Sequence, residues 1–188
     1  MILEIPLPAW FDAWVGTLPA RLDDDAAAMS VALETCRRNL DARSGGPFGA
    51  VVADAGTGKV LGVGVNLVVC GRASILHAEI VALTLAQRWA GCDNLSAGGR
   101  AVTLYSTAEP CAMCLGAIPW SGVSRLVCGA RDADVRAIGF DEGDKPSDWE
   151  AGLRRRGIAV TRDFRREEAA GLLARYAAEG GVRYGSRG

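Results

Sequence analysis

Helix-period patterns and short apolar runs alternate along the chain, and this alternation limits the possible folds more than any other feature of the sequence. A helical spacing of apolar residues precedes two strand-length runs, and single helical and strand-like segments alternate from there on. We expect helices at 23–43, 76–90, 111–120, 149–156 and 165–179, strands at 48–53, 60–69, 101–106, 126–128 and 158–160, and a loop at 131–147. This order predicts an α/β fold, a three-layer α/β/α sandwich with a mixed central sheet of about five strands.

The length and composition are typical of one globular domain. Of the 188 residues, 49% are hydrophobic and the formal net charge is −1, which excludes an intrinsically disordered chain. We expect a single domain over residues 1–188, with an N-terminal extension at 1–22, a core at 45–160 and a C-terminal tail at 180–188.

The apolar runs are too short for a membrane span, which needs about 20 residues. The longest runs, at 60–70 and 75–86, are interrupted by Asn66 or by His77 and Glu79. An acidic residue, Glu4, stands where a secretory signal carries a base, and the six cysteines lack the spacing of a disulfide framework. We therefore expect a cytoplasmic protein with no membrane partner.

The charge balance argues against a dedicated nucleic-acid-binding protein. Lys and Arg number 21 and Asp and Glu number 22, so the chain has no basic excess. Basic runs lie at 154–156 and 165–166, and such runs usually form a solvated helix face. We expect a small-molecule partner and no nucleic acid.

One histidine and two cysteines have the residue types and spacing of a metal site. The only histidine begins the sequence His77-Ala78-Glu79, and Cys111 and Cys114 form a C-x-x-C pair. Zinc takes imidazole nitrogen and thiolate sulfur, and three protein ligands leave a fourth position open to water, as in catalytic sites. We predict one zinc ion per chain, bound by His77, Cys111 and Cys114, with Glu79 close to the water but not a ligand.

Other interpretations of these residues stay open. A lone C-x-x-C pair also occurs in redox sites or by chance, and Cys70 would complete a closed, structural four-ligand site. Otherwise we expect the remaining cysteines to be small buried residues: Cys36, Cys70, Cys92 and Cys128.

The pattern H-x-E followed by P-C-x-x-C is typical of zinc deaminases. Over about residues 45–160 the sequence resembles the cytidine-deaminase-like superfamily of zinc hydrolases. The resemblance implies a three-layer α/β/α fold with the zinc ligands at two helix N-termini. It also implies hydrolytic deamination of an amino-substituted heterocycle.

Further segments are similar to bacterial guanine deaminases of this superfamily: 45–51, Asn66, 109–118, 137–142 and 183–186. The resemblance implies conversion of guanine to xanthine and ammonia, with Glu142 joining Glu79 as a catalytic residue that handles protons. It also implies a homodimer in which the C-terminal tail crosses to the partner and closes its site. The chain departs from that family at residues 1–22, at Pro119 and at 144–149, beside the expected pocket.

Several side chains are candidates for binding the substrate. The carboxamide of Asn66 offers a donor and an acceptor to a base edge, although hydrogen bonding at a strand end is its alternative role. Phe48 would stack on a heterocycle or belong to the core. Weaker candidates for the pocket wall are Ala78, Trp120, Phe140 and Tyr184.

The sequence leaves rival functions open. An s-triazine such as ammeline shares the amino–oxo pattern of guanine, and guanosine or cytidine would fit if the pocket has room for a ribose. A tRNA adenosine deaminase shares the metal motif but must hold a polyanion. A non-enzymatic module stabilised by zinc is the remaining alternative.

Overall fold

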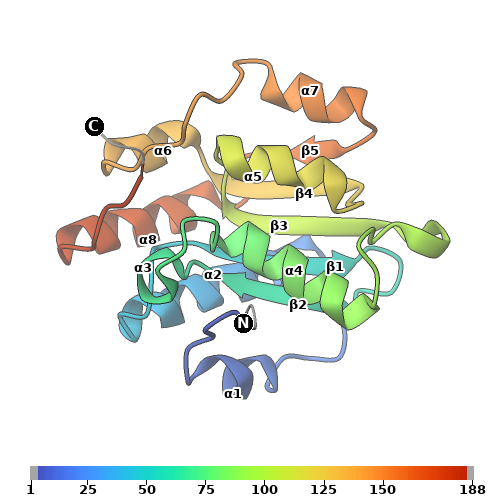
Figure 1. The fold of residues 1–188 in the computed structure, drawn as a ribbon, viewed down its shortest axis with the longest axis horizontal. Helices are drawn as coiled ribbons and strands as arrows, with labels where there is room; N and C mark the ends of the chain where they lie inside the picture. The colour runs from blue at the N-terminus through green and yellow to red at the C-terminus, as the bar shows by residue number, and fades with distance from the viewer. Residues whose placement is uncertain (1–3, 186–188) are drawn as a thin grey trace.

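A mixed five-stranded sheet forms the centre of the computed structural model, which describes residues 4–185 (Figure 1). The strands follow the order β2-β1-β3-β4-β5, in which β1 is antiparallel to β2 and β3, while β3, β4 and β5 are parallel. Their bounds are Gly49–Asp54 (β1), Val60–Val65 (β2), Val102–Ala108 (β3), Arg125–Ala130 (β4) and Ala159–Thr161 (β5).

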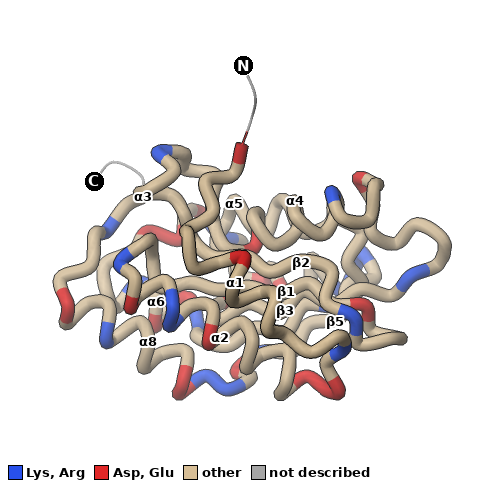
Figure 2. The backbone as a smooth tube through the Cα atoms, turned by 90° about the horizontal axis from the view of Figure 1, so that it is seen from below, with Lys and Arg blue, Asp and Glu red and all other residues tan. Residues whose placement is uncertain are grey.

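Helices cover both faces of this sheet, as Figure 2 shows from the side. One face carries α2 (Asp25–Asp41) and α8 (Arg166–Ala178), and the other carries α4 (Ala78–Ala90), α5 (Ala112–Ala117) and α7 (Trp149–Arg155). The short helices are α1 (Phe11–Val15), α3 (Val68–Gly71), α6 (Asp132–Ala137), and the 3₁₀ turns η1 (Ala97–Gly99) and η2 (Ile118–Trp120). The predicted three-layer α/β/α architecture is confirmed. No helix within residues 4–185 is long and apolar enough to span a bilayer.

The strands are apolar on both sides because each face of the sheet packs against helices. In β1, Val51 and Ala53 belong to the core beneath α2 and α8, whereas Ala50 and Val52 belong to the core beneath α4 and α5. The continuous apolar runs in the sequence reflect this burial on both faces.

Two glycines of β2 let α4 lie directly on the strand. A Cβ atom at Gly64 would overlap the backbone of Ala78 and Ala82, and one at Gly62 would overlap that of Ala82 and Ala86. The helix α4 therefore begins beside the C-terminal end of β2. This places His77 and Glu79 at the same end of the sheet as the residues that follow β3.

Some predicted elements were wrong in extent. The strand expected at 60–69 ends at Val65, because the Asn66 side chain accepts a hydrogen bond from Val68 N at 3.2 Å and turns the chain into α3. The loop expected at 131–147 contains α6, where the Asp134 carboxylate accepts a hydrogen bond from Arg131 N. Only Val135 of α6 is buried, so the helix has no apolar period to detect.

Two of the four cysteines that were predicted to be buried are not. Cys36 and Cys128 are buried as expected, but Cys70 is exposed and Cys92 is half-buried. The N-terminal extension contains α1 and packs against α2, where Trp14 Nε1 donates to Thr35 Oγ1 at 3.0 Å.

Candidate active site

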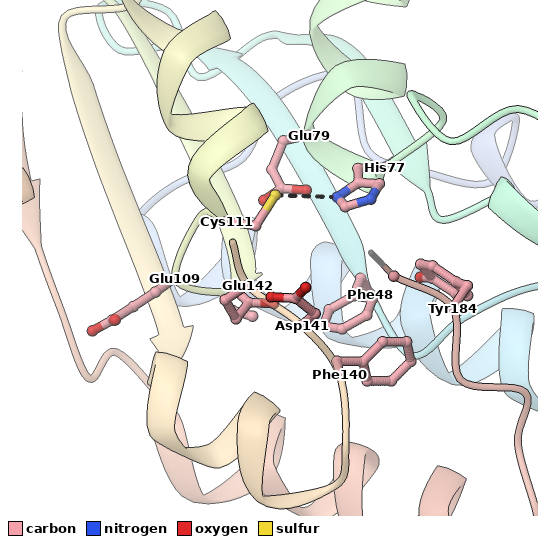
Figure 3. A pocket seen from close by; sticks show the side chains of 11 residues that line it. Phe48, His77, Glu79, Glu109, Cys111, Phe140, Asp141, Glu142 and Tyr184 are labelled. Carbon is pink, nitrogen blue, oxygen red and sulfur yellow. Dashed lines mark hydrogen bonds between the residues drawn. The ribbon is translucent and has the colours of Figure 1, made fainter. Parts of the chain in front are cut away.

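The candidate site lies at one edge of the sheet, where the ends of β1, β2 and β3 meet. Phe48 precedes β1, His77 precedes α4, and Cys111 follows β3. The loop after α6 and the C-terminal tail add Glu142 and Tyr184, so segments that are far apart in the sequence line one pocket (Figure 3). Ligands of α/β proteins commonly bind at the carboxyl ends of parallel strands, and β3 and β4 end here.

The three predicted metal ligands converge. Their ligand atoms all lie within 4.8 Å of one another, and no other His, Cys, Asp or Glu joins this cluster among residues 4–185. His77 Nδ1 is 3.4 Å from Cys111 Sγ and 3.6 Å from Cys114 Sγ. Tetrahedral zinc bonds of about 2.3 Å to sulfur and about 2.05 Å to nitrogen place such atoms about 3.6 Å apart. The cluster therefore fits zinc and leaves one tetrahedral position free of protein ligands.

The electrostatics of the cluster suit a cation. A hydrogen bond from the Cys114 thiol and the neighbouring His77 together lower the pKa of Cys111 to about 4, against the opposing effect of burial. Cys111 is therefore a thiolate at neutral pH, which is the form that binds zinc.

Two buried carboxyl groups lie beside the cluster. Burial, and then the Cys111 thiolate, raise the pKa of Glu79 to about 7. Burial, the same thiolate and Glu79 raise the pKa of Glu142 to about 8. Both side chains are 6% exposed, and in Figure 3 Glu79 lies next to Cys111 and His77. Carboxyl groups of this kind can take up and release protons near neutral pH.

Aromatic rings form the opposite wall of the pocket. The ring centroids of Phe48 and Phe140 are 5.3 Å apart, those of Phe140 and Tyr184 are 5.0 Å apart, and those of His77 and Tyr184 are 6.2 Å apart. These rings and the metal-ligand cluster line the same pocket, so a planar ligand bound there would have aromatic faces on one side and the cluster on the other.

Two polar atoms in this region have no partner within the described residues. Asn66 Nδ2 and Tyr184 Oη are both buried and unpaired. Both side chains border Gly46, where a Cβ atom would lie 2.5 Å from Tyr184 Oη and 3.1 Å from Asn66 Oδ1. An unpaired buried donor costs about 1–3 kcal/mol, so these atoms point to a ligand that completes their hydrogen bonds.

Two of the candidate residues lie elsewhere. Trp120, the last residue of η2, is 82% exposed and lines a separate groove with Pro119 and Trp149. Ala78 is fully buried at the first position of α4, where it belongs to the core against the sheet and does not line the pocket.

Glu109 and Gly185 also line the pocket, although neither was predicted as a site residue from the sequence. The position of Glu109 directly before Pro110 and the C-x-x-C pair was the signal that would have drawn attention to it. Asp141 lines the pocket too, and its carboxylate accepts a hydrogen bond from Gly143 N at 2.7 Å.

Comparison with known proteins agrees with this geometry. The family model for the cytidine and deoxycytidylate deaminase zinc-binding region matches residues 22–130. The chain is 34% identical to the guanine deaminase of Bacillus subtilis over 58% of its own length and 70% of that protein. It is 39% identical to a tRNA-specific adenosine deaminase of Haemophilus influenzae, over 63% of its own length and 65% of that protein.

A solved structure extends the match to nearly the whole chain. The guanine deaminase from Nitrosomonas europaea is 46% identical, with a TM-score of 0.89 over 94% of this chain and 97% of that one. The fold, the three converging ligands and the family match together show that this chain belongs to the zinc-binding cytidine and deoxycytidylate deaminase family.

Proposed function

We propose that this protein is a zinc-dependent aminohydrolase that converts guanine and water to xanthine and ammonia. One observation carries the proposal: the three zinc ligands and the buried Glu79 adjoin a pocket that is also lined by Tyr184, whose hydroxyl has no partner among the described residues. The guanine deaminases of B. subtilis and N. europaea, to which the chain is similar, support guanine as the substrate.

The protein's own groups would move the protons of this reaction. A zinc ion at the three ligands supplies activated water at neutral pH. Glu79 accepts a proton and delivers it to N3 of guanine, beside the carbon C2 that gains the water oxygen. A second proton must reach the departing 2-amino group, because an amide ion is a very poor leaving group, and Glu79 or Glu142 donates it. Each positioned acid–base group contributes about 10²–10⁴-fold.

The remaining residues would hold and orient the base. Asn66 Nδ2 is available to donate to an acceptor on the purine edge. Phe48 and Phe140 offer apolar surface to the ring. Tyr184 lies over the same pocket, and this coverage favours a free base over a nucleoside that carries a ribose.

Charge weighs against a tRNA substrate. Lys and Arg are interspersed with Asp and Glu along α2 and α8 in Figure 2. Several of these arginines pair with carboxylates, as Arg165 does with Glu168 at 2.6 Å and Arg175 with Asp41 at 2.7 Å. A polyanion needs unpaired basic groups along its path.

Ammonia release by the zinc-loaded protein tests the proposal, with guanine, ammeline, guanosine, cytidine, cytosine and a tRNA adenosine stem-loop as substrates. We expect turnover of guanine, with xanthine as the product and much slower reaction of the nucleosides. Preferred turnover of ammeline, a nucleoside or the stem-loop would replace guanine by that substrate. Zinc binding without turnover of any substrate would favour a zinc-stabilised binding module.

We further propose that the protein is a cytoplasmic homodimer whose C-terminal tail is exchanged between subunits. All six cysteines are free thiols, which suits a reducing compartment. Exposed apolar side chains, among them Trp120 and Met113, would be easier to bury in a dimer. In the single chain, Arg183 Nε donates to Ile138 O at 2.7 Å, so the tail binds beside the pocket. In a dimer, the same place would be occupied either by the chain's own tail or by the tail of the partner subunit. Residues 186–188 of the expected tail lie outside the described residues.

Mixing two inactive variants tests the exchange. A chain with Glu79→Gln and a chain with Tyr184→Ala are co-refolded so that mixed dimers form. If tails are exchanged, the mixed dimer contains one site with both native residues, and activity reappears. If each tail closes its own site, every site keeps one defect and no activity is recovered. A monomeric mass in solution would refute the dimer itself.

A further inference from the structure

Lys145 follows Glu142 on the same loop, and its ammonium group is buried between that loop and the segment that leads to the zinc ligands. Its side chain is only 6% exposed. Nζ lies 3.4 Å from Glu109 Oε2, 3.3 Å from Pro110 O and 3.0 Å from Asp132 Oδ1. Glu109 Oε2 and Pro110 O accept hydrogen bonds from this ammonium group, and the Asp132 carboxylate adds an ion pair.

Glu109 is the buried acceptor at the centre of this network. Although it lines the pocket, its carboxylate points away from His77 and Glu79 (Figure 3). Arg162 Nη2 lies 2.6 Å from its Oε1, and its Oε2 accepts a hydrogen bond from Asp132 N at 3.1 Å. Both carboxylate oxygens are therefore occupied, so Glu109 acts as an anchor for Lys145 and not as a group that handles protons.

The loop that carries Glu142 is attached to its surroundings at three successive places. The carbonyl of Glu142 accepts a hydrogen bond from Ala112 N at 2.9 Å, and the carbonyl of Gly143 accepts one from Arg136 Nη2 at 2.9 Å. Lys145 makes the third attachment. It alone of the three reaches Pro110 O, one residue before Cys111.

We propose that Lys145 is a positioning residue, which holds the Glu142 loop, and with it the Glu142 carboxylate, at a fixed place relative to the zinc ligands. The inference rests on the proposed function, since Glu142 belongs to the same site. Lys145 does not line the pocket, so it acts through Glu142 and not on the substrate. A displacement of about 1 Å in a catalytic group is enough to slow a reaction about 100-fold.

The variant Lys145→Met tests this role, because methionine keeps the apolar stem and removes the charge. The chain has two lysines, and Lys59→Met is the matched control. Lys59 Nζ lies 4.3 Å from the centroid of the Trp89 ring, much as Lys145 Nζ lies 5.2 Å from that of Trp149, but Lys59 is an exposed residue before β2.

For Lys145→Met we expect kcat on guanine to fall about 10- to 100-fold, while KM changes less than about 3-fold and the zinc content stays at that of the wild type. Hydrogen exchange of the zinc-loaded protein, followed by mass spectrometry, should become faster in residues 139–148. Lys59→Met should change none of these quantities. Unchanged exchange in this loop, or an unchanged kcat, would overturn the proposal.

A double variant separates positioning from general stabilisation. If Lys145 acts through Glu142, adding Lys145→Met to Glu142→Gln costs little further activity, because the group being positioned has already been removed. If the two losses multiply, Lys145 acts by another route and the proposal is wrong.

Two further measurements keep the test decisive. Asp132→Asn removes one negative partner of Lys145 without touching the lysine, and we expect a smaller rise in loop exchange and a kcat loss of a few-fold. This variant decides the question if Lys145→Met does not fold, and wild-type behaviour of Asp132→Asn would then overturn the proposal. If the wild type does not deaminate guanine, the proposed function fails, but the exchange comparison of Lys145→Met with Lys59→Met still decides whether the lysine holds the loop.

Discussion

Two buried asparagines near the pocket have opposite hydrogen-bond environments, and their replacement by alanine should have opposite consequences. Asn66 is 1% exposed and its Nδ2 has no partner, while its Oδ1 accepts one hydrogen bond from Val68 N. Asn39 is 0% exposed and fully paired: Nδ2 donates to Gly46 O at 2.9 Å and to Asn66 O at 3.0 Å, and Oδ1 accepts from Ser44 Oγ at 2.7 Å.

The sizes of the two effects follow from these contacts. Asn66→Ala loses one hydrogen bond, worth about 0.5–1.5 kcal/mol, but also removes an unpaired buried donor that costs about 1–3 kcal/mol. The two terms oppose each other, so the free energy of unfolding should change by between a loss of about 0.5 kcal/mol and a gain of about 2.5 kcal/mol. Asn39→Ala loses three hydrogen bonds and should cost about 3 kcal/mol, which lowers the melting temperature by roughly 6–12 °C in a chain of this size.

The loss of activity should be larger for Asn66→Ala than for Asn39→Ala, the reverse of the order in stability. If Asn66 Nδ2 donates to the bound base, Asn66→Ala loses a hydrogen bond that only the substrate completes, and kcat/KM for guanine should fall about 10- to 100-fold. Melting curves and steady-state rates of both variants, at equal zinc content, are the assay. A different outcome would show that Asn66 is a structural residue at a strand end and not a substrate-binding one. In that case Asn66→Ala would lower the melting temperature as much as Asn39→Ala, while kcat/KM would stay within about 3-fold of the wild type.

Two further predictions concern the scaffold. Gly64→Ala should destabilise the fold and reduce zinc binding, since a Cβ atom there overlaps Ala78 and Ala82 in α4. The control is Gly171→Ala in α8, where a Cβ atom meets no atom within 4 Å. It should stabilise the protein by about 0.5–1 kcal/mol. Thermal melts and zinc analysis compare the two, and equal stability would contradict the packing argument. The hydrogen bonds from Arg125 hold the pKa of Asp25 below its ordinary value of 3.8, against the effect of burial. Because the folded-state pKa is the lower one, this stabilisation is complete above that value and is lost as pH falls through the lowered pKa. Asp25→Asn should therefore be less stable than the wild type by about 1–2 kcal/mol at pH 7, and the difference should shrink below about pH 4; a constant difference would contradict it.

The sequence predicted the parts of the molecule that rest on local patterns. The zinc ligands were found because few other chemistries need His77, Cys111 and Cys114 in that arrangement, and the long helices were found from their apolar period. The strand predicted through Val68 and Val69 ends at Val65, because the Asn66 side chain accepts a hydrogen bond from Val68 N and turns the chain. An apolar run alone does not carry that information.

Contacts between distant segments could not be predicted in the same way. The partners of Lys145 come from two other segments, around Glu109 and Asp132, and no local motif links them. Trp120 shows the same limit of local patterns: it is close to the C-x-x-C pair in sequence, but in the structure it is exposed and does not line the pocket beside the zinc ligands.

Zinc-dependent turnover is the sharpest test of whether this protein is a zinc aminohydrolase that uses Glu79. Protein stripped with a chelator is titrated with zinc while bound metal and the rate of xanthine formation from guanine are measured, in parallel with Glu79→Gln. We predict that activity returns linearly up to one zinc per chain, and that Glu79→Gln binds the same amount of zinc but turns over at least about 100-fold more slowly. Full activity without zinc, or undiminished turnover by Glu79→Gln at full zinc occupancy, would contradict the account.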